Sequence, residues 1–139
     1  MPITPEHAGR EYPPTDPYEI TAVKVDEFAQ ALGERDVHRV PPTFAMVVLG
    51  DAWQAMFDDP ELGLALHRIV HGDQKFTWER PLRIGDVVTA TLRIDRVVQR
   101  GGVDMITSVA ALDTVDGEHL ATASALFLHT PEAESGEGA

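Results

Sequence analysis

The feature that most constrains the fold is a run of three long strand-like segments, and in the first of them apolar and polar residues alternate. They cover residues 87–98, 103–115 and 120–130, and Gly101-Gly102 and Asp116-Gly117 separate them. A period of two predicts β-strands with one buried face, and the Asp-Gly pair is a strong hairpin signal. At roughly 11–13 residues each, the segments exceed the usual strand length of about five or six. They therefore predict a strongly curved antiparallel sheet.

An apolar segment earlier in the chain is predicted to cover this sheet. Residues 44–57 are apolar nearly all round for two turns, follow Pro41-Pro42-Thr43 and end at Asp58-Asp59-Pro60. We expect Thr43 to cap this helix and its sides to be mostly buried. It is the only candidate for covering the apolar face of the sheet. The predicted fold class is therefore α+β, with a curved antiparallel sheet wrapped around a long central apolar helix.

The N-terminal region predicts an arm and two short elements. Residues 1–17 contain five prolines, which predicts an extended N-terminal arm that starts pairing near Tyr18. Residues 18–23 have the pattern of a short strand. Apolar residues at positions 25, 28, 29 and 32 then form one stripe of a short helix, which Gly33 is expected to end.

The middle and the end of the chain complete the predicted domain. Residues 65–71 and 74–79 read as strands joined by a turn at Gly72-Asp73. The single domain is expected to cover residues 18–130, and residues 131–139 are expected to form a flexible acidic tail.

Composition narrows the classes of function. The 139 residues are 43% hydrophobic and 24% charged, which is typical of one globular domain. There is no cysteine, which excludes disulfides, thiolate nucleophiles and Cys-based metal sites. Eleven Lys and Arg residues against 23 Asp and Glu give a net charge of −12, which argues against nucleic-acid binding. Without a signal peptide or an apolar stretch near the roughly 20 residues of a membrane span, we expect a cytoplasmic protein with no membrane insertion.

Several catalytic motifs are missing from the sequence. The three serines include no Gly-x-Ser-x-Gly elbow, and the sequence has no Gly-x-Gly-x-x-Gly, P-loop or His-Glu-x-x-His. His67 and His71 are four residues apart, which in a strand places them on one face at a separation of about 13 Å, too far for one metal ion. We therefore expect no metal and no cofactor.

Several segments come in a familiar order and spacing: Pro41-Pro42-Thr43-Phe44, His71-Gly72-Asp73-Gln74, and Arg80-Pro81-Leu82-Arg83-Ile84-Gly85-Asp86. Over residues 9–130 the chain resembles the MaoC-like hydratases and dehydratases. More narrowly, it is similar to the N-terminal-type, HadA-like subunit of actinobacterial (3R)-hydroxyacyl-ACP dehydratases. The resemblance implies a hot-dog fold and the reversible syn addition of water to a trans-2-enoyl thioester. It also implies an Asp and a His five residues later as acid and base, beside an oxyanion site at the start of the central helix.

The segment expected to carry that acid–base pair departs from the family pattern. Residues 33–38 read Gly-Glu-Arg-Asp-Val-His, and the sequence contains no asparagine to supply the family's Asn-Pro between the two catalytic residues. Asp36 and His38 are the candidate catalytic pair, with Glu34 and His38 as the alternative pair. The same residues also fit a polar connector exposed to water.

Five residues are candidates for binding the substrate. His71 and Gly72 lie where the chain is expected to turn near the mouth of the groove, where His71 would contact the thioester or its pantetheine arm. Phe44, Val47 and Phe76 belong to the apolar set expected to form the core, the wall of an acyl channel, or both.

Three functions stay open at this point. The first is a subunit that binds the acyl thioester of CoA or ACP and stabilises a heterodimer with a motif-bearing MaoC-like partner. The second is a self-sufficient homodimeric hydratase that uses a rearranged Asp/His pair. The third is an acyl-thioester-binding protein without turnover. Docking to an acidic carrier protein would require arginines to gather into one patch, and the candidates are Arg80, Arg83, Arg93, Arg96 and Arg100.

Overall fold

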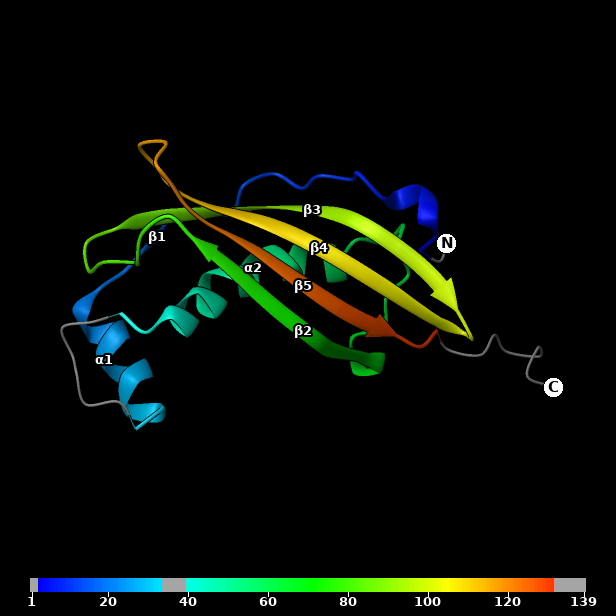
Figure 1. The fold of residues 1–139 in the computed structure, drawn as a ribbon, viewed down its shortest axis with the longest axis horizontal. Helices are drawn as coiled ribbons and strands as arrows, with labels where there is room; N and C mark the ends of the chain where they lie inside the picture. Colours follow the sequence, from blue (N-terminus) through cyan, green and yellow to red (C-terminus); the bar gives the residue numbers. More distant parts are fainter. Residues whose placement is uncertain (1–2, 34–39, 132–139) are drawn as a thin grey trace.

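A curved antiparallel sheet forms the body of the molecule (Figure 1). The computed structural model describes residues 3–33 and 40–131. Within them the strand order is β1-β3-β4-β5-β2, and every neighbouring pair is antiparallel. The strands are β1 (Tyr18–Glu19), β2 (Ile69–Trp78), β3 (Val87–Arg100), β4 (Val103–Thr114) and β5 (His119–His129). The helices are α1 (Ala22–Ala31) and α2 (Ala45–Phe57), with short 3₁₀ turns at Pro5–His7, Pro42–Phe44 and Leu66–Arg68.

The alternation predicted for the first long strand holds over most of its length, and burial also alternates along most of the other two. In β3 the buried and outward-facing residues alternate from Val87 to Ile94, and in β4 they alternate from Val103 to Leu112. Both predicted hairpins form, and Gly117 adopts a φ of 96°, which favours glycine. Register shifts mark β-bulges in β2, in β3 and where β4 meets β5. Because bulges increase local twist, they help these long strands to curl around α2.

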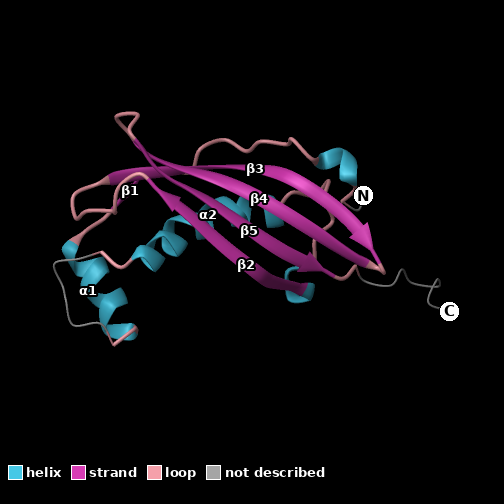
Figure 2. Ribbon diagram, in the orientation of Figure 1, coloured by secondary structure: helices cyan, strands magenta, loops and turns pink. Residues whose placement is uncertain are grey.

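Helix α2 lies against one face of the sheet, as Figure 2 shows. One side of the helix is buried, and the opposite side is open, with Val47 38% exposed and Gly50, Asp51 and Gln54 also at the surface. The prediction that the helix is buried on most sides is therefore wrong for a single chain, since one sheet covers only one side. The buried side consists of Ala45, Val48, Leu49, Ala52, Trp53 and Met56.

The start of α2 also differs from the prediction. Thr43 is not its cap, because it lies inside the 3₁₀ turn Pro42–Phe44, and the capping position falls to Phe44 with no side-chain hydrogen bond. The fixed φ of Pro42 suits the first position of this turn, so the chain becomes helical before Thr43 can act as a cap.

Helix α1 takes over part of the predicted strand 18–23. The Thr21 hydroxyl accepts a hydrogen bond from the Lys24 backbone N–H at 3.3 Å, so the strand ends at Glu19. Gly33 has a φ of 76° just after the helix, as predicted. Leu32, expected in the buried stripe, is 57% exposed because the helix ends at Ala31.

The N-terminal arm pairs with the sheet earlier than predicted. Backbone N–H groups of Gly9, Tyr12 and Thr15 donate to carbonyls of β3, with Tyr12 donating to Leu92 at 2.9 Å. Pairing therefore begins well before Tyr18 and covers one edge of β3. The Tyr12 hydroxyl also donates to Asp59, just beyond α2, at 2.8 Å.

Strand β2 runs through the predicted turn. It is continuous over Ile69–Trp78, and Gly72-Asp73 is accommodated as a bulge opposite Leu126. The earlier residues of the predicted strand 65–71 form instead the 3₁₀ turn Leu66–Arg68. Beyond Pro131, the predicted acidic tail lies outside the described residues.

Candidate functional site

An apolar cavity of about 410 Å³ lies beside the start of α2. Three segments build it: the residues just before α2, the end of β2, and the loop that joins β2 to β3. Trp78 forms one wall and stacks on Phe76 with ring centroids 5.6 Å apart. A concave apolar site with few polar groups is the usual form of a small-molecule site. The lining residues are Val40, Pro42, Trp78, Pro81, Leu82, Arg83 and Ile84.

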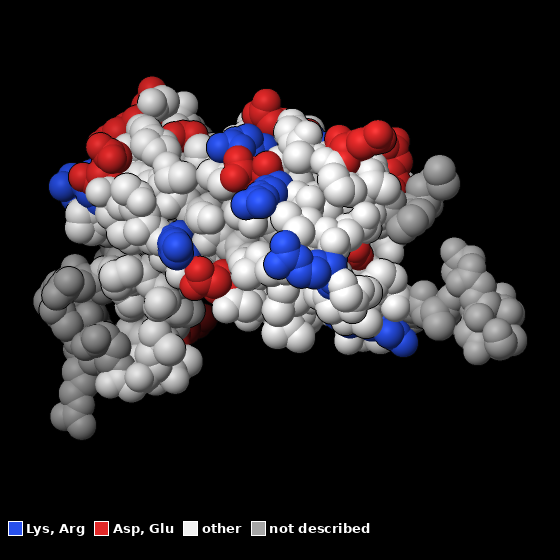
Figure 3. Space-filling model, turned by 45° about the vertical axis from the view of Figure 1, so that its right-hand side comes forward, with Lys and Arg blue, Asp and Glu red and all other residues white. Residues whose placement is uncertain are grey.

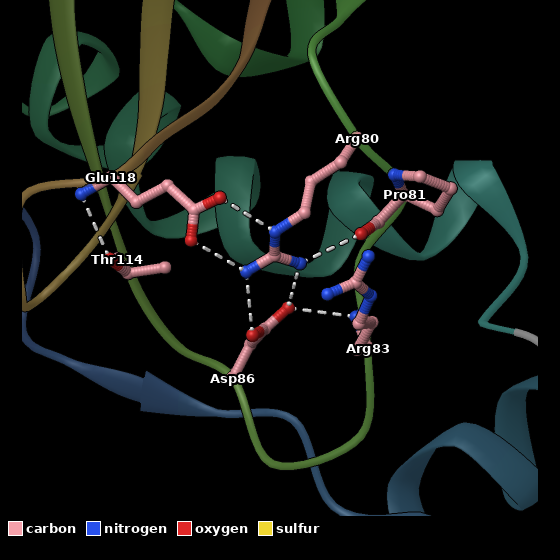
Figure 4. Close-up of polar contacts among 6 residues, drawn as sticks. All are labelled: Arg80, Pro81, Arg83, Asp86, Thr114 and Glu118. Carbon is pink, nitrogen blue, oxygen red and sulfur yellow. Dashed lines mark hydrogen bonds and ion pairs between the residues drawn. The ribbon is translucent and has the colours of Figure 1, made fainter.

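The β2–β3 loop is held in place by Arg80 (Figure 4). Its guanidinium donates to both carboxylate oxygens of Asp86, at 2.9 and 3.0 Å, and to both oxygens of Glu118, at 3.0 and 3.2 Å. The fifth N–H donates to the Pro81 carbonyl at 2.9 Å. Asp86 also accepts from the Arg83 backbone N–H at 2.8 Å. Every donor of Arg80 is thus used: two fasten the loop to the β4–β5 turn through Glu118, and three brace the loop internally through Asp86 and Pro81.

These contacts shift the ionisation of the three side chains. Hydrogen bonds from Arg80 hold the pKa of Asp86 below the usual range of an aspartate, and they also lower the pKa of Glu118. Hydrogen bonds to the same two carboxylates raise the pKa of Arg80. All three groups are therefore charged at neutral pH.

The predicted catalytic residues cannot be placed around this cavity. Asp36 and His38, together with the alternative Glu34, lie outside the described residues. Residues 34–39 directly precede Val40 in the sequence, and Val40 lines the cavity.

The structure separates the predicted substrate-binding residues. Phe44 and Val47 line a second, more open hollow of about 330 Å³, together with Tyr18, Lys24 and residues of α1. Phe44 is almost fully buried and meets Phe28 edge to face at 5.3 Å.

The three candidates on β2 lie elsewhere. His71 is exposed, packs on Phe127 with ring centroids 4.9 Å apart, and its Nε2 lies 3.0 Å from Gln74 Oε1. Gly72 is part of the bulge. Phe76 stacks on Trp78, which lines the 410 Å³ cavity.

Sequence reasoning missed a buried histidine–aspartate pair between β4 and β5. His129 Nδ1 lies 2.8 Å from Asp104 Oδ2, and both side chains are less than 5% exposed. The Ala65 backbone N–H donates to Nε2, so the ring proton sits on Nδ1 and is donated to Asp104. Gln99 bridges Asp104 and the Ile3 carbonyl, so the network ties the N-terminal arm and the segment before β2 to the sheet. Asp104 and His129 stand at strand positions that face the buried side, where an apolar residue is usual. A polar residue at such a position is the signal that could have identified them.

The five arginines considered for a docking patch do not form one. Arg80 is used in the loop, and Arg93 pairs with Asp95. Arg96 and Arg100 line a shallow hollow of about 290 Å³ with Met105 and Leu126. Figure 3 shows Lys and Arg atoms spread over the middle of one face and Asp and Glu atoms mainly along its upper margin.

Comparison with known proteins identifies the family of the chain. Residues 6–123 match the family described as the FAS1-like dehydratase domain region. The chain belongs to this family. A UPF0336 protein of Cutibacterium acnes is 48% identical over 136 residues, covering 94% of this chain and 96% of the relative. A UPF0336 protein of Saccharopolyspora erythraea is 37% identical over 153 residues, covering 99% and 98% of the two chains.

Solved structures share the fold of this FAS1-like dehydratase region. The truncated HadBC (3R-hydroxyacyl-ACP dehydratase) complex of Mycobacterium tuberculosis matches with a TM-score of 0.76 at 22% identity, covering 88% of this chain and 96% of that one. HtdX of the same organism matches with a TM-score of 0.77 at 17% identity, and the match covers 87% of this chain and 51% of HtdX. The (R)-hydratase of A. caviae involved in PHA biosynthesis matches with a TM-score of 0.62 at 16% identity, and the match covers 86% of this chain and 94% of the hydratase. The predicted hot-dog fold and the resemblance to MaoC-like dehydratases are confirmed.

Two further observations concern the described residues alone. Neither of the helices there is both long and apolar enough to span a bilayer. No group of three or more potential metal ligands gathers in residues 3–33 and 40–131.

Proposed function

We propose that this chain is a subunit of a MaoC-like (3R)-hydroxyacyl-thioester dehydratase or enoyl-thioester hydratase. Its role is to bind the acyl thioester and to stabilise a dimer, while a motif-bearing partner supplies the catalytic Asp and His. The observation that carries the proposal is the apolar cavity beside the start of α2, next in sequence to a connector that lacks the family's Asn-Pro.

The chemistry of the cavity supports binding more than catalysis. Hydration needs a group that takes a proton from water and one that protonates the α-carbon. None of the described residues that line the cavity is a carboxylate or an imidazole, and Arg83 is the one ionisable group among them. The proton-transfer groups must therefore come from residues 34–39 or from another chain.

Two open surfaces of the chain support a dimer. Strand β2 pairs with β5 on one side and has no strand on its other side within the described residues. Helix α2 keeps Val47 and Gly50 exposed on the side away from the sheet. An uncovered strand edge is a hazard that proteins usually cover, and a second subunit would do so.

The test is reconstitution. The chain is co-purified with a MaoC-like subunit that carries the intact Asp-x-Asn-Pro-x-His motif, and hydration of a trans-2-enoyl-CoA is followed by loss of its absorbance. We expect a stable complex whose turnover disappears when the partner's motif histidine is changed to alanine. Turnover that survives this change and is lost in His38→Ala of this chain would replace the proposal with the self-sufficient hydratase.

A further inference from the structure

Among the described residues that line the cavity, Arg83 is the single charged one. The others are Val40, Pro42, Trp78, Pro81, Leu82 and Ile84, and Ile84 is 44% exposed at the rim. A ligand that fits this site therefore offers apolar groups to the wall and one negative group to Arg83.

The Arg83 guanidinium is available for such a group. No hydrogen bond or ion pair joins it to any described residue, and Figure 4 draws a contact only to its backbone nitrogen. The nearby Asp86 forms no ion pair with this guanidinium; its two oxygens accept hydrogen bonds from the Arg80 side chain and from the Arg83 backbone N–H. The two arginines of the loop thus differ, because Arg80 pairs directly with two carboxylates and Arg83 pairs directly with none among the described residues.

The loop also holds Arg83 at the rim. Arg80 fastens the loop to Asp86 and Glu118, Leu82 is 4% exposed, and the Gly85 backbone N–H donates to the Ile20 carbonyl at 2.8 Å. Because the contact between Arg83 and Asp86 uses the backbone, replacing the Arg83 side chain leaves that contact intact. Arg83 can therefore be tested without loosening the loop.

From this arrangement we propose that Arg83 binds the phosphate at the far end of the pantetheine arm, while the apolar wall holds the arm. The inference rests on the proposed function, since CoA and a carrier protein both present a thioester on such an arm. A chain of net charge −12 repels anions as a whole, so recognition of a phosphate requires a local, unpaired cation. Arginine suits this role because its planar fork matches phosphate oxygens.

The experiment compares matched thioesters that differ by one phosphate. Equilibrium binding of butanoyl-pantetheine and butanoyl-4′-phosphopantetheine to the full chain is measured by calorimetry; both are saturated and cannot be hydrated. We expect the phosphorylated compound to bind about tenfold more tightly, equivalent to about 1.4 kcal/mol. In Arg83→Ala the ratio of the two affinities should fall to near one, and Arg83→Lys should keep part of this preference.

Arg96→Ala is the matched control. The Arg96 guanidinium also has no hydrogen bond or ion pair to any described residue, but Arg96 lines the hollow on β3 and β4 instead of the cavity. Its preference for the phosphorylated compound should equal that of the wild type. If both variants lose the preference for the phosphorylated compound equally, the preference arises from the net charge of the chain, and the assignment to Arg83 is overturned.

Two further results would overturn it. If Arg83→Ala weakens binding of butanoyl-CoA alone, the contact is with the adenosine phosphates of CoA. If the wild type binds the phosphorylated and phosphate-free thioesters equally, Arg83 does not recognise the phosphate, although the chain still binds thioesters. Failure of the wild type to bind any thioester would instead refute the proposed function.

Discussion

Replacing Arg80 by methionine should lower the free energy of unfolding by about 2–3 kcal/mol. The Arg80 and Asp86 side chains are 15% and 13% exposed, whereas Glu118 is 56% exposed. Hydrogen bonds to charged groups contribute roughly 1.5–3 kcal/mol, and breaking a fully buried ion pair costs roughly 3–5 kcal/mol. The contact with Glu118 adds little because water screens it. Methionine keeps much of the side-chain volume, so the loss reports the charged contacts.

The contribution of Arg80 to stability should depend on pH, because it acts through the carboxylate of Asp86. Arg80 lowers the pKa of Asp86 in the folded chain, so this stabilisation is present above the unfolded aspartate pKa of about 4. It is lost as the pH falls through the lower, folded pKa. The difference between wild type and Arg80→Met should therefore be constant from about pH 7 to pH 5 and shrink below about pH 4.

Urea unfolding followed by circular dichroism measures the difference at each pH. At neutral pH we expect the variant to melt about 6–12 °C below the wild type, given roughly 3–4 °C per kcal/mol for a chain of this size. Arg93→Met is the control, because its pair with Asp95 is 46% and 44% exposed and should contribute less than about 1 kcal/mol. A loss in Arg80→Met no larger than in Arg93→Met, or one that is unchanged at low pH, would refute the reasoning.

Three other substitutions test separate parts of the structure. Asp104→Ala removes the acceptor of the buried His129 and should cost about 2–4 kcal/mol in urea unfolding, whereas Asp104→Asn keeps an acceptor and should cost less. Gly117→Ala should cost about 1–2 kcal/mol in the same assay, because the φ of 96° disfavours a side chain although no atom lies within 4 Å of the added Cβ. Ile84→Asp should weaken thioester binding at least severalfold in calorimetry while leaving the melting temperature within about 2 °C, because Ile84 is 44% exposed on the cavity rim; unchanged binding would mean that the cavity does not hold the thioester.

Much of the fold could be predicted because burial in a sheet imposes a period of two. The alternation in β3, together with the turn signals at Gly101-Gly102 and Asp116-Gly117, placed the three long strands to within two residues at each end. The bulge at Gly72 was missed because a Gly-Asp pair is equally typical of a turn, and only the pairing with β5 decides between them.

The site was harder to predict than the fold. The cavity is built by loop residues 81–84 and by Val40 and Pro42, which carry no periodic pattern and meet only through tertiary packing. Phe44 and Val47, predicted from their place near the start of α2, line a different hollow. The proposed roles of Asp36 and His38 remain predictions.

The central claim is that this chain binds the acyl thioester while another chain carries out the hydration. Its most direct test is turnover of a short trans-2-enoyl-CoA by the purified chain, measured beside its His38→Ala variant. The account predicts no turnover above the buffer rate from either protein. Turnover by the wild type that is lost in His38→Ala would contradict it and make residues 34–38 a working active site.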